Sequence, residues 1–481
     1  MAQNKLAWTF LITTIALFMT ALDNLVVVTA IPVIQRDLHA TLSDLEWTVN
    51  AYTLTFAVLL LTGAALGDRF GRKRLFIIGL AIFTAASAMA ALSNDINVLL
   101  VARALQGLGS AIVTPLTLTI LAYATPAEKR GAIIGAWGGI AGLAVAIGPV
   151  VGGAIVTGIA WQWIFWLNVP IGLIAIPLAW RALDESRGPY AHLDFEGLVL
   201  ASVGLFGIVW GLVRANAIGW GSTEVLLGLI GGAVVLCVFL WWEGRSSTPM
   251  LPLRFFRMRS FAAANAASVF MYFGMFGSIF LLTQFLQTVQ HYSALQAGLR
   301  MLAWTGVTMF VAPVAGILSD RVGGRLLMVA GLVSQAIALF WMAAVATPTV
   351  PFSHLLVPFI LAGVGMGLFF APVANVVLAA VRPEEEGQAS GANNALRELG
   401  GVFGIAVLAA IFAEKGHYPA PPDFAGQPFV DGMKIAVYVG AAIVAVGAVA
   451  SYLVPRAKNV WGESGEPAAA SPDGTVAATD V

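Results

Sequence analysis

Apolar stretches about 20 residues long recur along this chain from Leu6 to Val454, with short polar breaks between them. A helix needs a stretch of this length to cross the hydrocarbon core of a bilayer. Of the 481 residues, 59% are hydrophobic and only 10% are charged, whereas an ordinary soluble domain is roughly 25% charged. The sequence therefore predicts an all-α polytopic membrane protein.

Charged or Gly/Pro-rich breaks divide the apolar sequence into fourteen predicted spans, with boundaries uncertain by about 2–4 residues. Six spans form a first block, two follow it, and six form a last block. In chain order they cover residues 8–34, 46–66, 75–93, 97–123, 132–157, 162–181, 196–214, 224–242, 261–289, 295–318, 326–346, 353–380, 388–413 and 432–454.

The basic residues orient these spans. With the N-terminus in the cytoplasm, eighteen of the 25 Lys and Arg residues fall in inner segments, five in outer segments and two within spans. Basic residues concentrate on the cytoplasmic side of membrane proteins, so both termini are predicted to be cytoplasmic. No cleavage signal follows the first apolar run, which is therefore predicted to be retained. Residues 456–481 are rich in Gly, Ala, Ser, Pro and Asp and are predicted to be a disordered tail.

Several classes of function are excluded or disfavoured by composition. The net charge is zero and no basic face carries interleaved aromatic residues, which argues against nucleic-acid binding. Cys237 is the only cysteine, and the five histidines lie far apart at loops or helix ends. No H-E-x-x-H or G-x-S-x-G string occurs, which disfavours an enzyme. No cofactor or metal is expected, while a receptor or sensor scaffold stays an open alternative.

Two halves of the sequence resemble each other. GDRFGRKR at residues 67–74 is echoed by GILSDRVGGR at 316–325, and LLVARALQGLG at 99–109 by LLVPFILAGVG at 355–365. The predicted division is a first six-helix half (8–181), a linker with two extra spans (182–260) and a second six-helix half (261–455). Duplicated halves are typical of transporters that rock around a site near the bilayer midplane, although duplication of a mere packing scaffold is the alternative.

These motifs resemble the fourteen-span drug:proton antiporters of the major facilitator superfamily, over residues 8 to 455. The loop at 67–74 matches the superfamily signature, with Ala64 where glycine is usual. GAWGGIAGLAVAIGPVVGG at 135–153 is similar to a motif that exporters carry, and its matching residues are Gly148, Pro149, Gly152 and Gly153. The resemblance implies export, and the glycines would allow tight packing between the halves. Ordinary small-residue packing is the alternative.

The resemblance also implies a cytoplasmic gate that holds the two halves closed. An aspartate at a helix end can accept hydrogen bonds from the backbone N–H groups of a neighbouring helix, while arginines donate. A short hairpin that is basic only because of its topology is the alternative. The residues concerned are Gly67, Asp68, Arg69, Gly71 and Arg72 in the first loop, and Asp320, Arg321 and Arg325 in the second.

Ionisable residues inside the spans indicate proton coupling. A charge at the bilayer centre costs at least about 2.5–3.5 kcal/mol, so it requires a partner or a task. Asp23 and Arg103 lie roughly 20 and 12 Å from the outer ends of their spans at 1.5 Å per residue, a difference that arginine can bridge. Protonating Asp23 would break such a pair and link the cavity to the proton gradient. A static buried ion pair is the alternative.

Arg397 and Glu398 lie about 10 residues into the thirteenth span, near the midplane. Adjacent helical residues point about 100° apart, so the two are expected to face different neighbours rather than each other. Arg397 resembles an arginine usual in this branch of the family. Glu398 is a second candidate proton site, with a simple polar contact between helices as the alternative.

A substrate cavity is predicted from an aromatic stripe with amides at its outer end, although such stripes more often face lipid or core. Its candidate residues are Phe273, Phe276, Phe280, Gln284 and Gln287, with Tyr52 and Trp47 on the second span. The expected function is export of small amphipathic or cationic molecules in exchange for protons, by a monomer in a bacterial cytoplasmic membrane. An importer or facilitator of a small metabolite is the nearest alternative.

Overall fold

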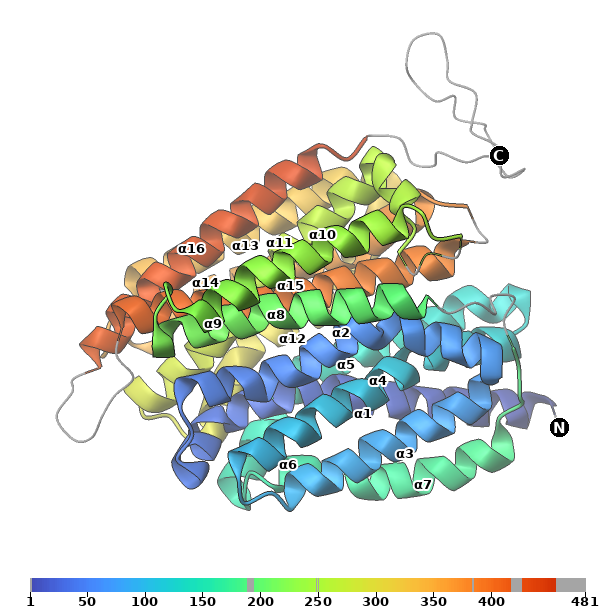
Figure 1. Ribbon diagram of the computed structural model, residues 1–481, viewed down its shortest axis with the longest axis horizontal. Coiled ribbons are helices and arrows are strands. Elements are labelled where there is room, and N and C mark those ends of the chain that lie inside the picture. The colour runs from blue at the N-terminus through green and yellow to red at the C-terminus, as the bar shows by residue number, and fades with distance from the viewer. Residues whose placement is uncertain are drawn as a thin grey trace, which may run out of the picture.

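A computed structural model describes residues 2–187, 194–247, 249, 251–382, 385–416 and 426–455, and every regular element among them is a helix (Figure 1). Helices satisfy their own backbone hydrogen bonds, which an apolar bilayer demands. The N-terminal half contains α1 (Ala2–Leu38), α2 (Leu42–Phe70), α3 (Arg72–Ala91), α4 (Ile96–Ala124), α5 (Ala127–Gly158), α6 (Trp163–Trp166) and α7 (Asn168–Ala182).

A helical hairpin follows, and then a second group of long helices that we call the C-terminal half. The hairpin contains α8 (Phe195–Ile218), α9 (Thr223–Leu226), the π-helical turn η1 (Leu227–Gly231) and α10 (Gly232–Glu243), and the short 3-10 helix η2 (Leu253–Arg257) follows it. The C-terminal half contains α11 (Arg259–Gln284), η3 (Phe285–Val289), α12 (Ala294–Val322), α13 (Gly324–Val345), α14 (Phe352–Ala379), α15 (Glu386–Lys415) and α16 (Gln427–Tyr452).

The polytopic architecture matches the prediction, but the number of spans is not confirmed as fourteen. Within the described residues, twelve helices are long and apolar enough to cross a membrane. The bent α2, broken near Leu60, makes a thirteenth, and α5 adds a shorter apolar helix at Ile147–Gly158. The beginning of α1 and the end of α16 lie at the same end of the bundle in Figure 1. The predicted tail, 456–481, lies outside the described residues.

The turns before α2 and α12 show that the sequence repeat is also a structural repeat. His39 and His291 both adopt positive φ angles, 52° and 55°. Two residues later in each copy a capping box opens the next helix. Thr41 and Asp44 form it at the start of α2, and Ser293 and Gln296 form it at the start of α12. We call this end of the bundle the outer end, because the basic residues predict that it faces outward.

At the other ends of α2 and α12, the chain reverses direction at glycines in equivalent positions. Gly71 has a φ of 110° and Gly323 a φ of 83°, a region that residues with a side chain rarely adopt. These glycines reverse the chain within the two loops that the sequence predicts to be copies. The chain therefore enters α3 and α13 in the same way.

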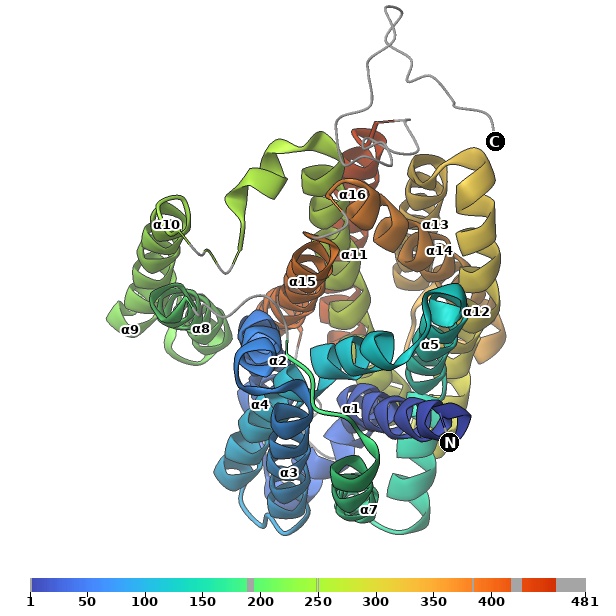
Figure 2. The same ribbon diagram turned by 90° about the vertical axis from the view of Figure 1, so that its right-hand side faces the viewer.

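The hairpin packs beside the boundary between the halves (Figure 2). Leu205 and Val209 of α8 share a buried cluster with Leu54 of α2 and Val402 of α15. The two arms of the hairpin approach closely through glycines, since a side chain at Gly228 would meet the backbone of α8. The hairpin thus contacts both halves along one side.

Candidate functional site

An ion pair between Asp23 and Arg103 lies inside the N-terminal half. Asp23 is on α1 and Arg103 on α4, and Arg103 Nη1 donates to Asp23 Oδ2 at 2.5 Å. Arg103 is fully buried and Asp23 is 3% exposed. The structure thus brings together the two embedded charges that the sequence paired, and their role in proton coupling stays a prediction.

Uncharged polar side chains complete the shell around the Asp23 carboxylate. Asn168 of α7 donates to Asp23 Oδ1 at 2.7 Å, and Gln106 of α4 donates to the same atom at 3.1 Å. Gln106 Nε2 and Asn168 Nδ2 also lie 2.8 and 3.4 Å from the hydroxyl oxygen of Ser87. The carboxylate therefore accepts three hydrogen bonds, which is what a charge needs to be tolerated in this environment.

The remaining faces of the Arg103 guanidinium contact α2. Its Nε donates to the carbonyl oxygen of Thr48 at 2.9 Å, and its Cζ lies 4.4 Å from the centre of the Tyr52 ring. Tyr52 in turn donates to the carbonyl of Thr20 and accepts from the hydroxyl of Ser110. Arg103 Nη2 has no hydrogen-bond partner. Tyr52 thus packs on the arginine, and its predicted place in the substrate cavity stays a prediction.

Arg103 has other partners besides Asp23. A proton on Asp23 would remove the charge that holds Arg103 Nη1, while Gln106 Oε1 at 2.9 Å, the Thr48 carbonyl and the Tyr52 ring would still hold the guanidinium. The pair joins α1 to α4 and its shell includes α7, so three helices meet at this carboxylate.

Arg397 and Glu398 correct the sequence prediction, because they contact each other. Arg397 Nε lies 3.6 Å from Glu398 Oε1, which is an ion-pair distance but too long for a hydrogen bond. The arginine side chain is long enough to turn back along the helix, and Glu398 is only 7% exposed. The guanidinium also lies 5.4 Å from the centre of the Tyr272 ring. Glu398 Oε2 has no hydrogen-bond partner.

The glycines of α5 bring the two halves into contact at the outer end. Gly148 and Gly152 lie against α1, and Gly153 approaches the backbone of Ala294 on α12 so closely that no side chain would fit. Gly298 of α12 approaches the carbonyl of Pro149 in the same manner. Two hydrogen bonds add to this contact, from Gln287 Nε2 to the Thr29 carbonyl at 2.9 Å and from the Leu295 amide to the Thr157 hydroxyl at 3.0 Å.

The first candidate gate loop differs from its prediction. Asp68 pairs with Arg72 of its own loop at 2.8 Å, and not with backbone N–H groups of a neighbouring helix. The N–H groups that open α3, those of Lys73 and Arg74, donate instead to Glu185 at 3.0 and 3.2 Å. Glu185 comes from the segment after α7, and its carboxylate fills the space beside Gly71. At the start of α3, Glu185 therefore plays the capping part that the sequence analysis expected of Asp68 at a neighbouring helix.

The other gate residues are placed without contacts across the halves among the described side chains. Arg69 lies 5.2 Å from the Phe70 ring, and Arg325 lies 4.0 Å from the Tyr452 ring of α16. Arg321 is exposed, and the side chain of Asp320 lies outside the described residues. Gly67 packs against a leucine of α4. The gating role stays a prediction.

The aromatic stripe of α11 is buried inside the molecule. Phe273, Phe276, Phe280 and Gln284 are all below a tenth exposed, so they do not face lipid. The side-chain amide of Gln287 donates the hydrogen bond to α1 described above. Trp47 packs on the rings of Phe206 and Trp210 of α8 at 5.7 and 5.9 Å, which makes it a contact of the hairpin.

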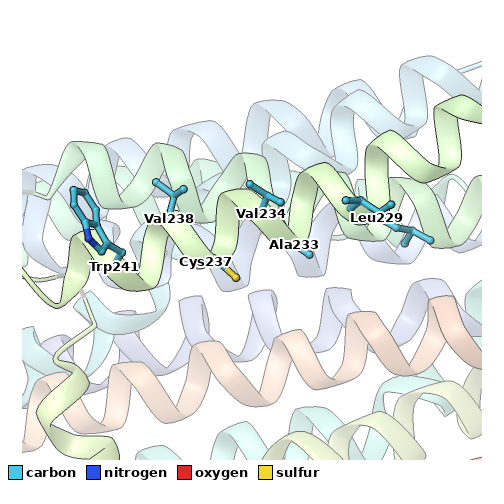
Figure 3. Close-up of a pocket in the computed structure, with 7 residues that line it drawn as sticks. Leu229, Ala233, Val234, Cys237, Val238 and Trp241 are labelled. Carbon is cyan, nitrogen blue, oxygen red and sulfur yellow. The ribbon is translucent and has the colours of Figure 1, made fainter.

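A hollow on the surface lies along α10 (Figure 3). It is lined by Leu229, Ile230, Ala233, Val234, Cys237, Val238 and Trp241. These side chains lie along one helix and offer no charge or hydrogen-bond pattern, so the hollow suits lipid contact. Among the residues that the structure describes, no three His, Cys, Asp or Glu side chains are grouped to hold a metal.

Comparison with known proteins decides the family. The Major Facilitator Superfamily model matches residues 13–405 and 264–476. The chain belongs to this superfamily. It is 35% identical over 410 residues to the tetracenomycin C resistance and export protein of Streptomyces glaucescens, covering 85% of this chain and 76% of the relative. It is also 35% identical over 407 residues to the multidrug resistance protein Stp of Mycobacterium tuberculosis, covering 84% and 75%.

A solved structure supports the same fold. A bacterial homolog of the human lysosomal transporter Spinster, in an inward-facing and unoccupied conformation, superimposes with a TM-score of 0.65 at 15% identity. The match covers 94% of this chain and 97% of that one. This major facilitator protein is therefore a multi-pass membrane transporter and not an enzyme.

Proposed function

We propose that this transporter exports small amphipathic organic molecules from the cytoplasm in exchange for protons, by alternating access. The observation that carries the proposal is the ion pair of Asp23 and Arg103. It is closed off from solvent, completely hydrogen-bonded on its acidic side, and shared between three helices of one half. Ionisable groups at such places in membrane helices are mostly retained for transport tasks.

The coupling step uses the carboxylate of Asp23. In the deprotonated state the ion pair and its shell hold α1, α4 and α7 together. When Asp23 accepts a proton, Arg103 loses its counter-charge, and the packing that favoured this state is weakened relative to the alternative state. A proton taken up on one side of the membrane and released on the other would thus drive the cycle.

The contacts between the halves indicate which state is described. The two hydrogen bonds between the halves described above lie at the outer end, where α5 also meets α12 through glycines. In the described part of the chain, no ion pair joins the halves at the opposite end. We interpret this as a state closed outside, in a monomer of the cytoplasmic membrane with both termini in the cytoplasm. Parting these contacts would open the exit.

The expected substrates are antibiotics or similar compounds. Both relatives are named for resistance to such compounds, and the Streptomyces glaucescens protein is also named for export. The buried aromatic stripe of α11 supplies apolar surface, and the Glu398 carboxylate supplies a polar contact for an amphipathic molecule. An importer of a small metabolite is the alternative that direction assays would separate.

The test is transport of ethidium into inside-out membrane vesicles made from cells that express the wild type or Asp23→Asn. Export predicts that ethidium accumulates in the vesicles only when their interior is acidic. An uncoupler should abolish this accumulation. Asp23→Asn should lower the proton-driven rate by at least about tenfold, because the amide cannot exchange a proton.

Asp431→Asn is the matched control, since it makes the same chemical change at an exposed position on α16. It should behave like the wild type. Proton-driven accumulation by Asp23→Asn at the wild-type rate would contradict the coupling role. Accumulation only when the vesicle exterior is acidic would contradict export.

A further inference from the structure

A third carboxyl group lies buried among the helices, on α2. Glu46 lies one turn from the outer end of α2, is 3% exposed, and its Oε2 has no hydrogen-bond partner. One turn deeper, Asn50 is fully buried, and neither its Oδ1 nor its Nδ2 has a partner. Residues four apart lie on one face of a helix, so these two polar side chains share one face of α2.

The face of α2 that bears Glu46 points away from α4. On the α4 side, the Thr48 carbonyl accepts from Arg103, and the Tyr52 carbonyl meets Gly107. At about 100° per residue, Glu46 points roughly opposite to that side. Its neighbours Leu45 and Trp47 belong to two different buried clusters, both of which include residues of the C-terminal half. Glu46 therefore faces the boundary between the halves.

The structural repeat leads to the same placement. Counted from the paired capping boxes at Thr41 and Ser293, Glu46 corresponds to Gly298 of α12. Gly298 lies in the contact between the halves, against the carbonyl of Pro149. The equivalent position on α2 thus belongs to the same kind of contact, formed with α15. One copy places a glycine there and the other an acid.

The surrounding charges are already engaged. On the far side of α2, Asp23 of α1 is bound to Arg103 of α4. On α15, Glu398 lies at ion-pair distance from Arg397, and on α8 Arg214 pairs with Glu224 at 3.2 Å. Near the outer end of α15, Lys415 pairs with its neighbour Glu414. Among the described residues, no basic side chain lies within ion-pair distance of Glu46.

We propose that Glu46 is a proton-binding site at the outer end, and that its protonation allows the halves to close there. An ionised carboxylate without a partner is costly to bury, whereas a carboxylic acid is not. When the outer contacts part, water reaches the carboxyl group and it can ionise. A proton from the outer solution then returns to it before closure. This inference rests on the proposed exchange of substrate for protons.

Closure at the outer end can be measured directly. The Leu295 amide and the Thr157 hydroxyl are 3.0 Å apart across the halves, so cysteines at these two positions report closure by cross-linking. Thr157→Cys and Leu295→Cys would be introduced together with Cys237→Ser, which removes the only native cysteine. Cross-linking by a bifunctional methanethiosulfonate is followed in proteoliposomes at outer pH from about 5 to 8.

In this background the cross-linking rate of the otherwise unchanged protein, divided by the rate of Glu46→Gln at the same pH, should rise as the outer pH falls. Glu46→Gln, which imitates the protonated side chain, should follow thiol reactivity alone, with a rate about tenfold above the unsubstituted rate at the alkaline end. Comparison at the same pH cancels the pH dependence of thiol reactivity. Glu414→Gln is the matched control, because Glu414 is an exposed carboxylate near the outer end. It should follow the unsubstituted protein.

Two results would overturn the proposal. One is a ratio between Glu46→Gln and the unsubstituted protein that stays constant with pH. The other is a cross-linking rate in the unsubstituted protein that varies with pH only as thiol reactivity does. This second result would overturn the proposal even if Glu46→Gln fails to accumulate. If ethidium transport is independent of the proton gradient while cross-linking depends on Glu46 and pH, the exchange mechanism fails and the proton site stands.

Discussion

The two halves share a packing arrangement but fill it with different chemistry. In the N-terminal half, Gly107 of α4 lets the helix approach the carbonyl of Tyr52 on α2. In the C-terminal half, Gly363 of α14 approaches the carbonyl of Trp304 on α12 in the same way. The residue four positions before each glycine is Arg103 in one half and Phe359 in the other.

The contact made by this residue changes accordingly. Arg103 lies over the Tyr52 ring at 4.4 Å and binds Asp23, whereas the rings of Phe359 and Trp304 meet edge to face at 6.0 Å. One duplicated position thus holds a cation over an aromatic ring in the first copy and an aromatic pair in the second. The C-terminal half thus packs this position without any charge, so packing alone does not require the ion pair of the N-terminal half, in line with its proposed role in transport.

The largest loss of stability is expected from removing one partner of the ion pair in the N-terminal half. Arg103→Leu leaves the Asp23 carboxylate buried without its cation, which should cost about 3–5 kcal/mol of stability. The double variant Asp23→Leu with Arg103→Phe, which imitates the apolar core of the other half, should recover most of this loss and remain inactive. Folded yield by size-exclusion chromatography and ethidium transport would measure the two effects. A double variant that transports like the wild type would contradict the comparison.

The reverse exchange should be nearly as harmful. Phe359→Arg places a charge against Trp304, where no carboxylate among the described residues pairs with it, and should cost at least about 2.5 kcal/mol. Phe359→Leu, which keeps the position apolar, should cost less than about 1.5 kcal/mol. Thermal unfolding in detergent measures both. Equal loss in the two variants would mean that shape, and not charge, separates the halves.

A smaller and equal effect is expected where the halves are alike. Gly107→Ala and Gly363→Ala each push a methyl group into a carbonyl oxygen of the facing helix, which should cost about 1–3 kcal/mol in both halves. Gly158→Ala is the control, since nothing lies within 4 Å of a Cβ at that position. Thermal unfolding would again serve. Unequal costs at the two matched glycines would show that the repeat does not preserve this packing.

Much of the fold followed from the sequence, because the bilayer restricts each span to a long apolar helix. The predicted spans 196–214 and 224–242, for instance, coincide with the arms of the hairpin at 195–218 and 223–243. The contact of Asp23 with Arg103 was also predictable, because two embedded charges of opposite sign have few other partners. Charge and hydropathy are local properties of a sequence, which is why they were readable.

The rest of the site depends on tertiary contacts that a sequence does not display. Gln106, Asn168 and Ser87 complete the Asp23 shell, but uncharged polar residues are common in transmembrane helices and carry no distinguishing spacing. Glu46 sits near a predicted boundary, where an acid is unremarkable unless burial is known. Arg397 lies at ion-pair distance from the adjacent Glu398, because the end of a flexible side chain need not follow the direction of its Cβ.

The smallest effect concerns the loops, where the halves differ again. Glu185 caps the first N–H groups of α3, whereas no side chain that the structure describes caps the start of α13 after Gly323. Glu185→Ala should therefore cost only about 0.5–1 kcal/mol, since the carboxylate is exposed to water. The change should be local: amide hydrogen exchange should become faster in the first turn of α3, and exchange in α13 should not change.

Asp184→Ala is the control for this last prediction. Asp184 lies in the same segment but pairs with Lys5 of α1, so its loss should leave exchange at Lys73 and Arg74 unchanged. Without Glu185, the first turn of α3 should exchange about as fast as the first turn of α13 already does. If it keeps its protection, another group satisfies these amides, and the loops of the two halves are more alike than their caps indicate.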